Sequence, residues 1–364
     1  MSPSVPAEDA SPAGRARTKG WLLVAAVVLV IGTLIGASTV ELPYYAIAPG
    51  GTLDVGRLVA VDEGTPAYRA NGSVLMTTVS LQRTTLVEAV RGWLDPTIDV
   101  VAEKQIRPKS IDADEAQKQN LLAMDTSKEL AAGVAFEQLG YDAISGTGAE
   151  IVEVVAGSPA AGAFEPGDTI TAVDGAPVEL HTDAVRLLRA HAPGEEVRVT
   201  VDPKGEVATR DVTVKLIANP EKLSQPMLGV QLRTRAIRFD FPYQVTINSA
   251  GIGGPSAGLA FTLEVLDLLT PGELTGGHAV AATGTIELDG TVGEVGGVAQ
   301  KTVAVRRAGA ELFLVPVGEL AEARAHAGKT LRVEPVRDLD DALRILASLG
   351  GNGLALGQPG RDGA

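Results

Sequence analysis

Residues 253–269 read GGPSAGLAFTLEVLDLL, a glycine-rich turn that leads into a strongly apolar run. The run predicts a buried helix over Ser256–Leu269, which ends before Pro271-Gly272. Proline suits the first turn of a helix because its missing N–H is not needed there. Ser256 is therefore expected at a helix N-terminus, where unpaired backbone N–H groups and the helix dipole favour negative charge.

Ser256 has two interpretations at this point. The N–H groups around it could hold the negative oxygen of a tetrahedral acyl intermediate, which makes Ser256 a candidate nucleophile and Gly254 part of its supporting turn. Alternatively, Ser256 is only the N-cap of a helix that follows a glycine-rich loop. The turn by itself favours neither interpretation.

A serine nucleophile needs a base, and Lys301 is the candidate. It ends the stretch Gly296–Lys301 (GGVAQK), near the start of a predicted helix with mostly apolar neighbours. Burial in such surroundings lowers the pKa of a lysine, and a neutral amine can take the serine proton. The alternative is a solvated surface lysine, which is the usual environment of this residue type.

Strands and helices alternate around this pair. Short apolar runs predict strands, and longer runs with helical spacing predict helices. The expected strands are Tyr243–Ile247, Val280–Ile286 and Leu312–Val315, and the expected helices are Gln300–Ala308, Val317–Ala327 and Leu339–Leu349.

The pattern changes several times upstream. Residues 44–110 contain short apolar runs broken by Gly50-Gly51 and Asn71-Gly72, which are strand and turn signals. Residues 112–139 are rich in Ala, Gln, Lys, Glu and Leu and predict a helix. Residues 140–218 return to short strands with one short helix. The chain as a whole is therefore expected to have an α+β fold.

Residues Trp21–Val40 (WLLVAAVVLVIGTLIGASTV) contain no charged side chain. A helix of this length spans about 30 Å, the thickness of the hydrocarbon core of a membrane. Arg15, Arg17 and Lys19 precede it, so the positive-inside rule predicts a single-pass anchor with a cytoplasmic N-terminus and an exported remainder. A cleaved signal peptide is the alternative, because Gly36-Ala37-Ser38 offers small residues for cleavage.

The composition excludes several functions. The formal net charge is −14 at pH 7, so the chain repels phosphate backbones and nucleic acid is not an expected partner. There is no cysteine, which excludes a thiol nucleophile, a disulfide framework and any cysteine-ligated metal. The histidines lie among polar or helical surface residues and suggest no metal site, and no cofactor is expected.

Residues 226–349 resemble the proteolytic domain of the Lon peptidases. The resemblance rests on Gly254–Gly258 (GPSAG), Thr283–Ile286 (TGTI), Leu288–Val292 (LDGTV) and Gly296–Lys301, in the family's order and close to its spacing. It implies a serine endopeptidase in which Ser256 is the nucleophile and Lys301 the general base. It also implies that the hydroxyl of Thr283 helps to position the lysine.

This chain departs from the Lon pattern in two respects. Many relatives have an acidic residue at the position of Gly253 and a glutamate at that of Thr285. Lon proteases usually carry an ATPase module, but no phosphate-binding loop is found here. Gly328-Lys329-Thr330 is incomplete, because Ala323 replaces the first glycine of that motif. Cleavage is therefore expected to be independent of ATP.

Residues 131–218 resemble a PDZ domain of the permuted bacterial kind. The resemblance rests on Gly157–Ala160 (GSPA), Phe164–Ile170 (FEPGDTI) and Val173–Gly175 (VDG). PDZ domains add a peptide strand to a sheet edge and hold its carboxylate on backbone N–H groups. Leu139-Gly140-Tyr141 loosely resembles the carboxylate-binding loop, and a helix C-cap glycine between core residues is the alternative.

Together, these features predict the order of segments. An anchor followed by a PDZ domain and a Lon-type domain is similar to a bacterial class of surface peptidases. This implies protein or peptide substrates recruited by the PDZ domain, the cell membrane as a partner, and a homo-oligomer formed through the peptidase domain. The expected segments are a cytoplasmic disordered tail (1–19), a transmembrane helix (20–41), an extracytoplasmic strand and helix region that packs on the peptidase domain (42–130), the PDZ domain (131–218), the Lon-type domain (226–349) and a disordered tail (350–364).

Two other functions fit parts of the sequence. Gly254-Pro255-Ser256-Ala257-Gly258 also satisfies the nucleophile motif of α/β-hydrolases, which requires a later histidine such as His278 or His326. Few strand–helix units precede the serine, which disfavours that fold. The chain could also be a scaffold with an inactive peptidase fold, although the intact Ser256 and Lys301 favour an enzyme.

Overall fold

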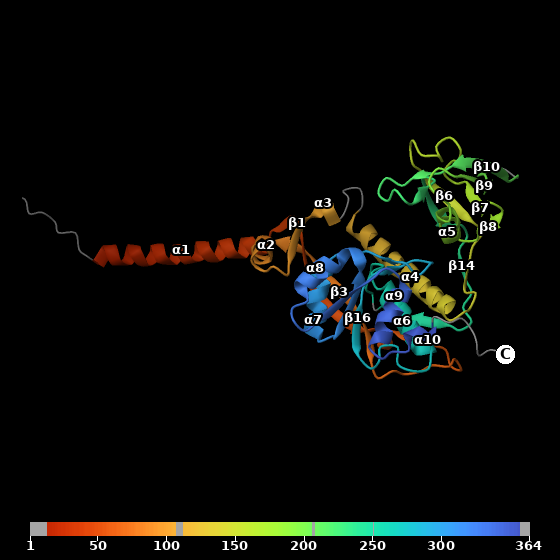
Figure 1. The fold of residues 1–364 in the computed structure, drawn as a ribbon. Coiled ribbons are helices and arrows are strands. Elements are labelled where there is room, and N and C mark those ends of the chain that lie inside the picture. The colour runs from red at the N-terminus through yellow and green to blue at the C-terminus, as the bar shows by residue number, and fades with distance from the viewer. Residues whose placement is uncertain (1–12, 107–111, 206–207, 250, 357–364) are drawn as a thin grey trace, which may run out of the picture.

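The computed structural model describes residues 13–106, 112–205, 208–249 and 251–356. Two six-stranded sheets organise this part of the chain. Figure 1 shows the larger body of sheet and helices, with the second sheet lying beside it at the upper right. The architecture is a mixture of α and β structure.

The first sheet combines strands from both ends of the chain. It contains β1 (Glu41–Asp54), β3 (Ser73–Thr85), β4 (Asp99–Ala102), β16 (Ala279–Ala282), β19 (Leu312–Pro316) and β20 (Arg332–Val336). The order is β20-β19-β16-β3-β1-β4, and β3 pairs in parallel with β16 and antiparallel with β1. Three upstream strands therefore form one half of the sheet and three downstream strands form the other, and the two halves meet where β3 pairs with β16.

Helices cover both faces of this sheet, because successive strand residues point to opposite faces. Ala282 belongs to a core shared with α4 (Ala113–Gln138), α6 (Gly258–Leu269) and α9 (Leu339–Ser348). Its neighbour Ala281 belongs to a second core, shared with α7 (Val298–Ala308) and α8 (Leu320–His326). Burial on both faces explains why the central strands read as unbroken apolar runs.

The second sheet has its own core. It contains β6 (Ala149–Val154), β7 (Thr169–Val173), β8 (Ala176–Pro177), β9 (Glu196–Asp202), β10 (Arg210–Lys215) and β13 (Val230–Thr234). Five of them follow the order β10-β9-β7-β6-β13, and β8 pairs with β7. Helix α5 (His181–Arg189) packs on this sheet through Ala184 and Leu188.

Short elements connect these layers. They are η1 (Val55–Arg57), β2 (Val59–Val61), α2 (Leu86–Leu94), α3 (Glu103–Ile106), β5 (Ile144–Ser145), β11 (Ile217–Ala218), β12 (Pro226–Met227), β14 (Arg238–Phe239), β15 (Val245–Ile247), β17 (Thr285–Ile286), β18 (Val292–Gly293), η2 (Val317–Glu319) and α10 (Gly353–Leu356). The pairing of β2 with β15 again joins an upstream segment to the C-terminal region.

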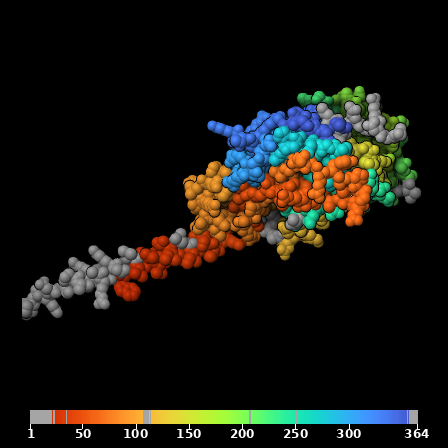
Figure 2. Space-filling model, turned by 90° about the horizontal axis from the view of Figure 1, so that it is seen from below, coloured from red at the N-terminus to blue at the C-terminus, as the bar shows by residue number. Residues whose placement is uncertain are grey.

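Helix α1 (Ala13–Thr39) projects away from the rest of the chain in both views (Figure 1, Figure 2). It overlaps the predicted transmembrane helix at 20–41. Spanning a bilayer takes about 20 consecutive, predominantly apolar residues in one helix. Within the described ranges, no helix has both the length and the apolar character for this. The prediction of a single-pass membrane protein is therefore wrong, and the predicted membrane localisation is wrong with it.

The two predicted disordered tails lie partly outside the described residues. Residues 1–12 and 357–364 are not described. The remaining part of the first tail belongs to α1, and α10 lies within the second.

Candidate active site

The Ser256 turn directly precedes α6. Ala257 is the N-cap, and the Phe261 N–H donates to its carbonyl at 2.9 Å. Gly258 has no room for a side chain, because a Cβ there would lie 2.8 Å from the backbone nitrogen of Ile286. Glycine at this position therefore allows α6 to begin against β17, which brings Ser256 close to that strand.

Lys301 lies near the start of α7 and is only 3% exposed. Burial lowers the pKa of its ammonium group to about 8, and the carboxylate of Glu319 opposes this shift. A substantial part of the lysine is therefore neutral near pH 8. This is the protonation state that a general base requires.

Thr283 links Lys301 to the Ser256 turn. The Lys301 Nζ donates to the Thr283 Oγ1 at 3.2 Å, and that hydroxyl donates to the Ser256 main-chain oxygen at 3.2 Å. The Gly284 N–H donates to the same oxygen at 3.0 Å. These bonds fix the lysine head group relative to the backbone of the serine.

Ser256 and Lys301 line the same cavity, which has a volume of about 540 Å³. The structure records no hydrogen bond between the Ser256 Oγ and the Lys301 Nζ. Thr77 of β3 lines this cavity too, and its Oγ1 is buried without a hydrogen-bond partner among the described residues. Leaving such a buried hydroxyl unpaired costs free energy.

Helix α4 forms two hydrogen bonds with the turn that carries Ser256. The Gly254 N–H donates to the Asn120 carbonyl at 2.8 Å, and the Ser127 Oγ donates to the Pro255 carbonyl at 3.1 Å. The N–H of Gly254 is therefore not free to bind an oxyanion in this conformation. In the described part of the chain, no acceptor is paired with the N–H of Ser256, which leaves that donor beside the cavity.

Glu319 is a site residue that the sequence did not reveal. It lies in η2 after β19, and its Oε1 accepts the Val295 N–H at 3.1 Å. Burial raises the pKa of its carboxyl, while the charge of Lys301 lowers it. In the sequence, Glu319 reads as an ordinary acid at the start of a helix, and no spacing connects it to Lys301.

The two histidines that an α/β-hydrolase would need lie elsewhere. His278 pairs with Glu311 at 2.8 Å, and the His326 Nδ1 contacts the Glu322 carbonyl oxygen at 3.0 Å. Neither histidine lines the cavity that contains Ser256. The geometry therefore gives no support to a serine–histidine arrangement.

Leu139, Gly140 and Tyr141 form the C-terminal cap of α4. The Gly140 N–H donates to the Glu137 carbonyl at 2.9 Å and the Tyr141 N–H to the Phe136 carbonyl at 3.0 Å, with Gly140 at φ +86°. This is the Schellman arrangement that commonly ends a helix. The Leu139 N–H also bonds within the helix, so all three donors are occupied.

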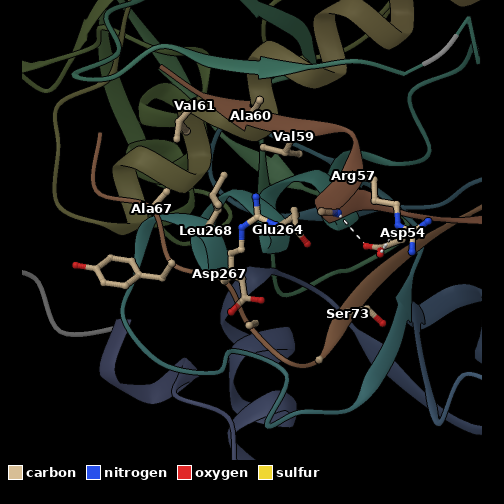
Figure 3. A pocket seen from close by; sticks show the side chains of 15 residues that line it. Asp54, Arg57, Val59, Ala60, Val61, Ala67, Ser73, Glu264, Asp267 and Leu268 are labelled. Carbon is tan, nitrogen blue, oxygen red and sulfur yellow. Dashed lines mark hydrogen bonds and ion pairs between the residues drawn. The ribbon is translucent and has the colours of Figure 1, made fainter. Parts of the chain in front are cut away.

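A second cavity, of about 510 Å³, lies along the C-terminal half of α6 (Figure 3). Glu264 and Asp267 line it from the helix, and Asp54 lines it from the end of β1. Burial, together with the charges of Asp267 and Asp54, raises the pKa of Glu264 to about 8. No described residue donates a hydrogen bond to the Glu264 carboxyl, whereas Asp267 accepts the Leu274 N–H at 2.9 Å.

The segment Gly328-Lys329-Thr330 lies between α8 and β20. A phosphate-binding loop needs the opposite order, a strand followed by the loop and then a helix whose N-terminus faces the phosphates. This segment therefore does not form such a loop.

Two family models match separate parts of the chain. Residues 131–216 match the PDZ domain model, and residues 245–348 match the model of the Lon protease (S16) C-terminal proteolytic domain. The chain thus contains a PDZ segment (131–216) and a Lon-type segment (245–348). The second includes Ser256, Thr283 and Lys301.

Curated relatives match the C-terminal region. The Lon protease of Chloroflexus aggregans is 34% identical over 97 residues, which cover 26% of this chain and 12% of that protein. Lon protease 1 of Myxococcus xanthus is 37% identical over 94 residues, 25% of this chain and 11% of that protein. The chain therefore spans only about an eighth of the length of these relatives.

One solved structure is similar to about a quarter of the chain. The PDZ domain of an SdrC-like protein from Listeria monocytogenes has 22% identity and a TM-score of 0.22, and the match covers 24% of this chain and 87% of that chain. The assignment of the PDZ segment therefore rests on the family model.

Proposed function

We propose that this chain is a serine endopeptidase in which Ser256 is the nucleophile and Lys301 the general base. The observation that carries the proposal is a buried lysine with a lowered pKa that lines one cavity with a serine at a helix N-terminus. The match of residues 245–348 to a proteolytic domain supports the same chemistry.

In the first half of the reaction, the neutral Lys301 amine takes the proton of the Ser256 hydroxyl as its oxygen attacks the substrate carbonyl carbon. The negative charge on the former carbonyl oxygen is stabilised by the α6 N-terminus and the Ser256 N–H. The Lys301 ammonium then protonates the leaving amine as the C–N bond breaks, which leaves an acyl-enzyme.

In the second half of the reaction, Lys301 activates a water molecule in the same way that it activated Ser256. Lys301, neutral again, takes a proton from a water molecule that attacks the acyl carbon. The ester bond to Ser256 then breaks as the Lys301 ammonium returns that proton to the Ser256 oxygen. The Thr283 hydroxyl keeps the amine aligned through both halves by the 3.2 Å hydrogen bond from the Lys301 Nζ.

Parallel assays of Ser256→Ala, Lys301→Ala and Lys329→Ala on an unfolded protein test this function. The first two should lower kcat/KM by at least about 10³-fold and about 10²-fold, because each removes one half of the pair. Lys329→Ala is the matched control, since Lys329 is exposed and outside the cavity. Equal rates in all variants would reject the pair, and no turnover by wild type would favour the scaffold alternative.

Cleavage is further proposed to need no nucleotide, because the one partial phosphate-loop motif has the wrong order of elements. Addition of ATP and Mg²⁺ should change the rate of protein cleavage by less than about twofold. A large stimulation by ATP would contradict this part of the proposal.

The PDZ segment is proposed to deliver protein substrates by an extended peptide. Deletion of residues 140–218 should then raise KM for proteins more than for short peptides, and an equal rise for both would argue against delivery. A homo-oligomer formed through the Lon-type segment is also proposed, and sedimentation velocity on the purified chain would detect it.

A further inference from the structure

Strand β13 forms one edge of the second sheet, where it covers β6. β13 pairs antiparallel with β6, and β14 pairs antiparallel with β5. Between these pairs, the Arg235 N–H donates to the Gly148 carbonyl at 2.8 Å and the Thr147 N–H to the Arg235 carbonyl at 2.9 Å. Residues 229–240, the internal segment, thus follow residues 143–155, the receiving strand, along their whole length.

Side chains hold the internal segment in place on both sides. Arg233 forms a two-pronged ion pair with Glu150, with N–O distances of 3.1 and 2.6 Å. On the other side, the His181 N–H at the start of α5 donates to the Thr234 Oγ1 at 3.1 Å. Leu232 packs on the core of the second sheet. The internal segment therefore lies between the receiving strand and α5, with the side chain of Leu232 half-buried.

A carboxylate from the same chain completes this arrangement. The Glu137 Oε1 accepts the N–H groups of Ala143 and Ile144 at 2.7 and 2.9 Å, at the start of the receiving strand. Successive backbone N–H groups on one carboxylate are how such domains hold the C-terminus of a bound peptide. Charge makes these hydrogen bonds stronger than neutral ones.

We propose that the internal segment and Glu137 are an internal ligand of the PDZ segment. They occupy the positions of an added peptide strand and of its C-terminal carboxylate, so an extended peptide with a free C-terminus binds only by displacing them. This rests on the proposed delivery of substrates by the PDZ segment. A tethered ligand competes at an effective concentration on the order of 1 mM, so free peptides bind the closed form weakly.

The first part of the proposal is that Glu137 occupies the position of a peptide's C-terminal carboxylate. It is tested with a fluorescein-labelled peptide, VQLRTRAIRF, the sequence of residues 230–239. Glu137→Ala frees the two N–H groups and should tighten binding of the free-acid peptide at least tenfold over wild type. The C-terminally amidated peptide should gain nothing. Glu129→Ala is the matched control, an exposed glutamate on the same helix. Equal tightening for the acid and the amide, or none for a Glu137→Ala chain with a native circular dichroism spectrum, would overturn the proposal.

The second part of the proposal is that the internal segment occupies the position of a bound peptide strand. It is tested with an engineered disulfide that can be formed and reduced. Glu150 and Arg233 are direct cross-strand partners, and the sequence contains no cysteine, so Glu150→Cys with Arg233→Cys introduces one defined disulfide. Directly opposed Cα atoms of antiparallel strands are about 4.5–5.5 Å apart, within the range a disulfide needs.

The chain with the disulfide formed should bind the peptide at least tenfold more weakly than the reduced chain. Its KM for an unfolded protein should also be at least tenfold higher. Cleavage of a short peptide should stay within twofold. Identical peptide binding by both forms would overturn the proposal. Peptide binding needs no catalysis, so an inactive protein that still shows the redox difference would count against the proposed peptidase only.

Discussion

At the scale of single residues, the proposed role of the buried Lys301 as general base predicts an activity that depends on pH. The Lys301 amine acts as a base only when neutral, and its pKa is about 8. We expect kcat/KM to rise about tenfold between pH 7 and pH 9 and then to level off, because the neutral fraction grows with pH. Stopped assays over this range measure it. A flat profile would contradict the assignment of Lys301 as the base.

Glu319 is expected to set the pH at which this rise occurs. Its carboxylate stabilises the charged lysine, so Glu319→Gln should lower the Lys301 pKa and move the midpoint of the profile below pH 8. Gln keeps an oxygen for the Val295 N–H, so the backbone contact is retained. Glu322→Gln is the control, on the adjacent helix α8. A midpoint that stays in place or moves up would rule out this role of Glu319.

Glu264 should make stability fall as pH rises. Its folded-state pKa is raised from 4.5 to about 8, so the native state binds more protons than the unfolded state between these values. The stabilisation is complete below about pH 4.5 and is lost as pH rises through 8. We expect Glu264→Gln to reduce the loss between pH 5 and 9 by on the order of 4 kcal/mol.

Urea unfolding at pH 5 and pH 9 measures this difference. Glu153→Gln, a change at an exposed carboxylate, serves as the control. A wild-type free energy of unfolding that is the same at both pH values, or a Glu264→Gln chain that loses as much as wild type, would show that the carboxyl is not buried in its neutral form.

At the scale of elements, α4 is expected to affect catalysis although it contributes no reacting group. Ser127→Ala removes the hydrogen bond to the Pro255 carbonyl, which should cost about 1 kcal/mol of stability. A looser turn misplaces the nucleophile, so kcat should fall about tenfold with little change in KM. Thr126→Ala, at the exposed neighbouring position, should change neither. An unchanged kcat in Ser127→Ala would show that the turn holds its shape without α4.

Local pattern was enough to predict helix α4 and strand β19. The prediction of a helix over 112–139 agrees with α4 at Ala113–Gln138, whose N-cap Asp112 accepts the Glu115 N–H. The predicted strand Leu312–Val315 likewise corresponds to β19 at Leu312–Pro316. Apolar spacing and caps act within a few residues, so a single sequence contains them.

Features that depend on distant partners were missed. β20 was not predicted, because Pro335 and charged residues break its apolar run and only its place at the sheet edge permits them. Gly50-Gly51 was predicted as a turn but lies inside β1. A Cβ at Gly50 would lie 2.5 Å from the Thr78 carbonyl oxygen, so this glycine allows close approach to β3.

The residues of the candidate site also differ in whether the sequence alone reveals them. Ser256 and Lys301 lie in motifs that can be found from sequence, and Thr283 follows from the family resemblance. Glu319 acts on Lys301 through its charge, and the Asn120 carbonyl accepts the Gly254 N–H in the turn before Ser256. Neither contact leaves a pattern in the sequence, because it exists only after the chain has folded.

At the scale of the whole molecule, the first sheet makes the two ends of the chain depend on each other. β3 lies between β1 and β16, and β2 pairs with β15. Val74 and Met76 of β3 are buried in the core that contains α6. The Lon-type segment therefore lacks part of its own sheet and core when it is separated from the upstream strands.

We accordingly expect a fragment of residues 226–349 not to fold cooperatively, because β16 would become an unpaired edge and the apolar face of α6 would lose its cover. Thermal melts followed by circular dichroism should show no sharp transition, and the fragment should bind the hydrophobic dye ANS. A fragment of residues 41–356 keeps every strand of both sheets and should melt as one or more sharp transitions. If residues 226–349 alone melted as sharply, and at the same temperature, the upstream strands would be an accessory layer rather than part of the fold that holds Ser256 and Lys301.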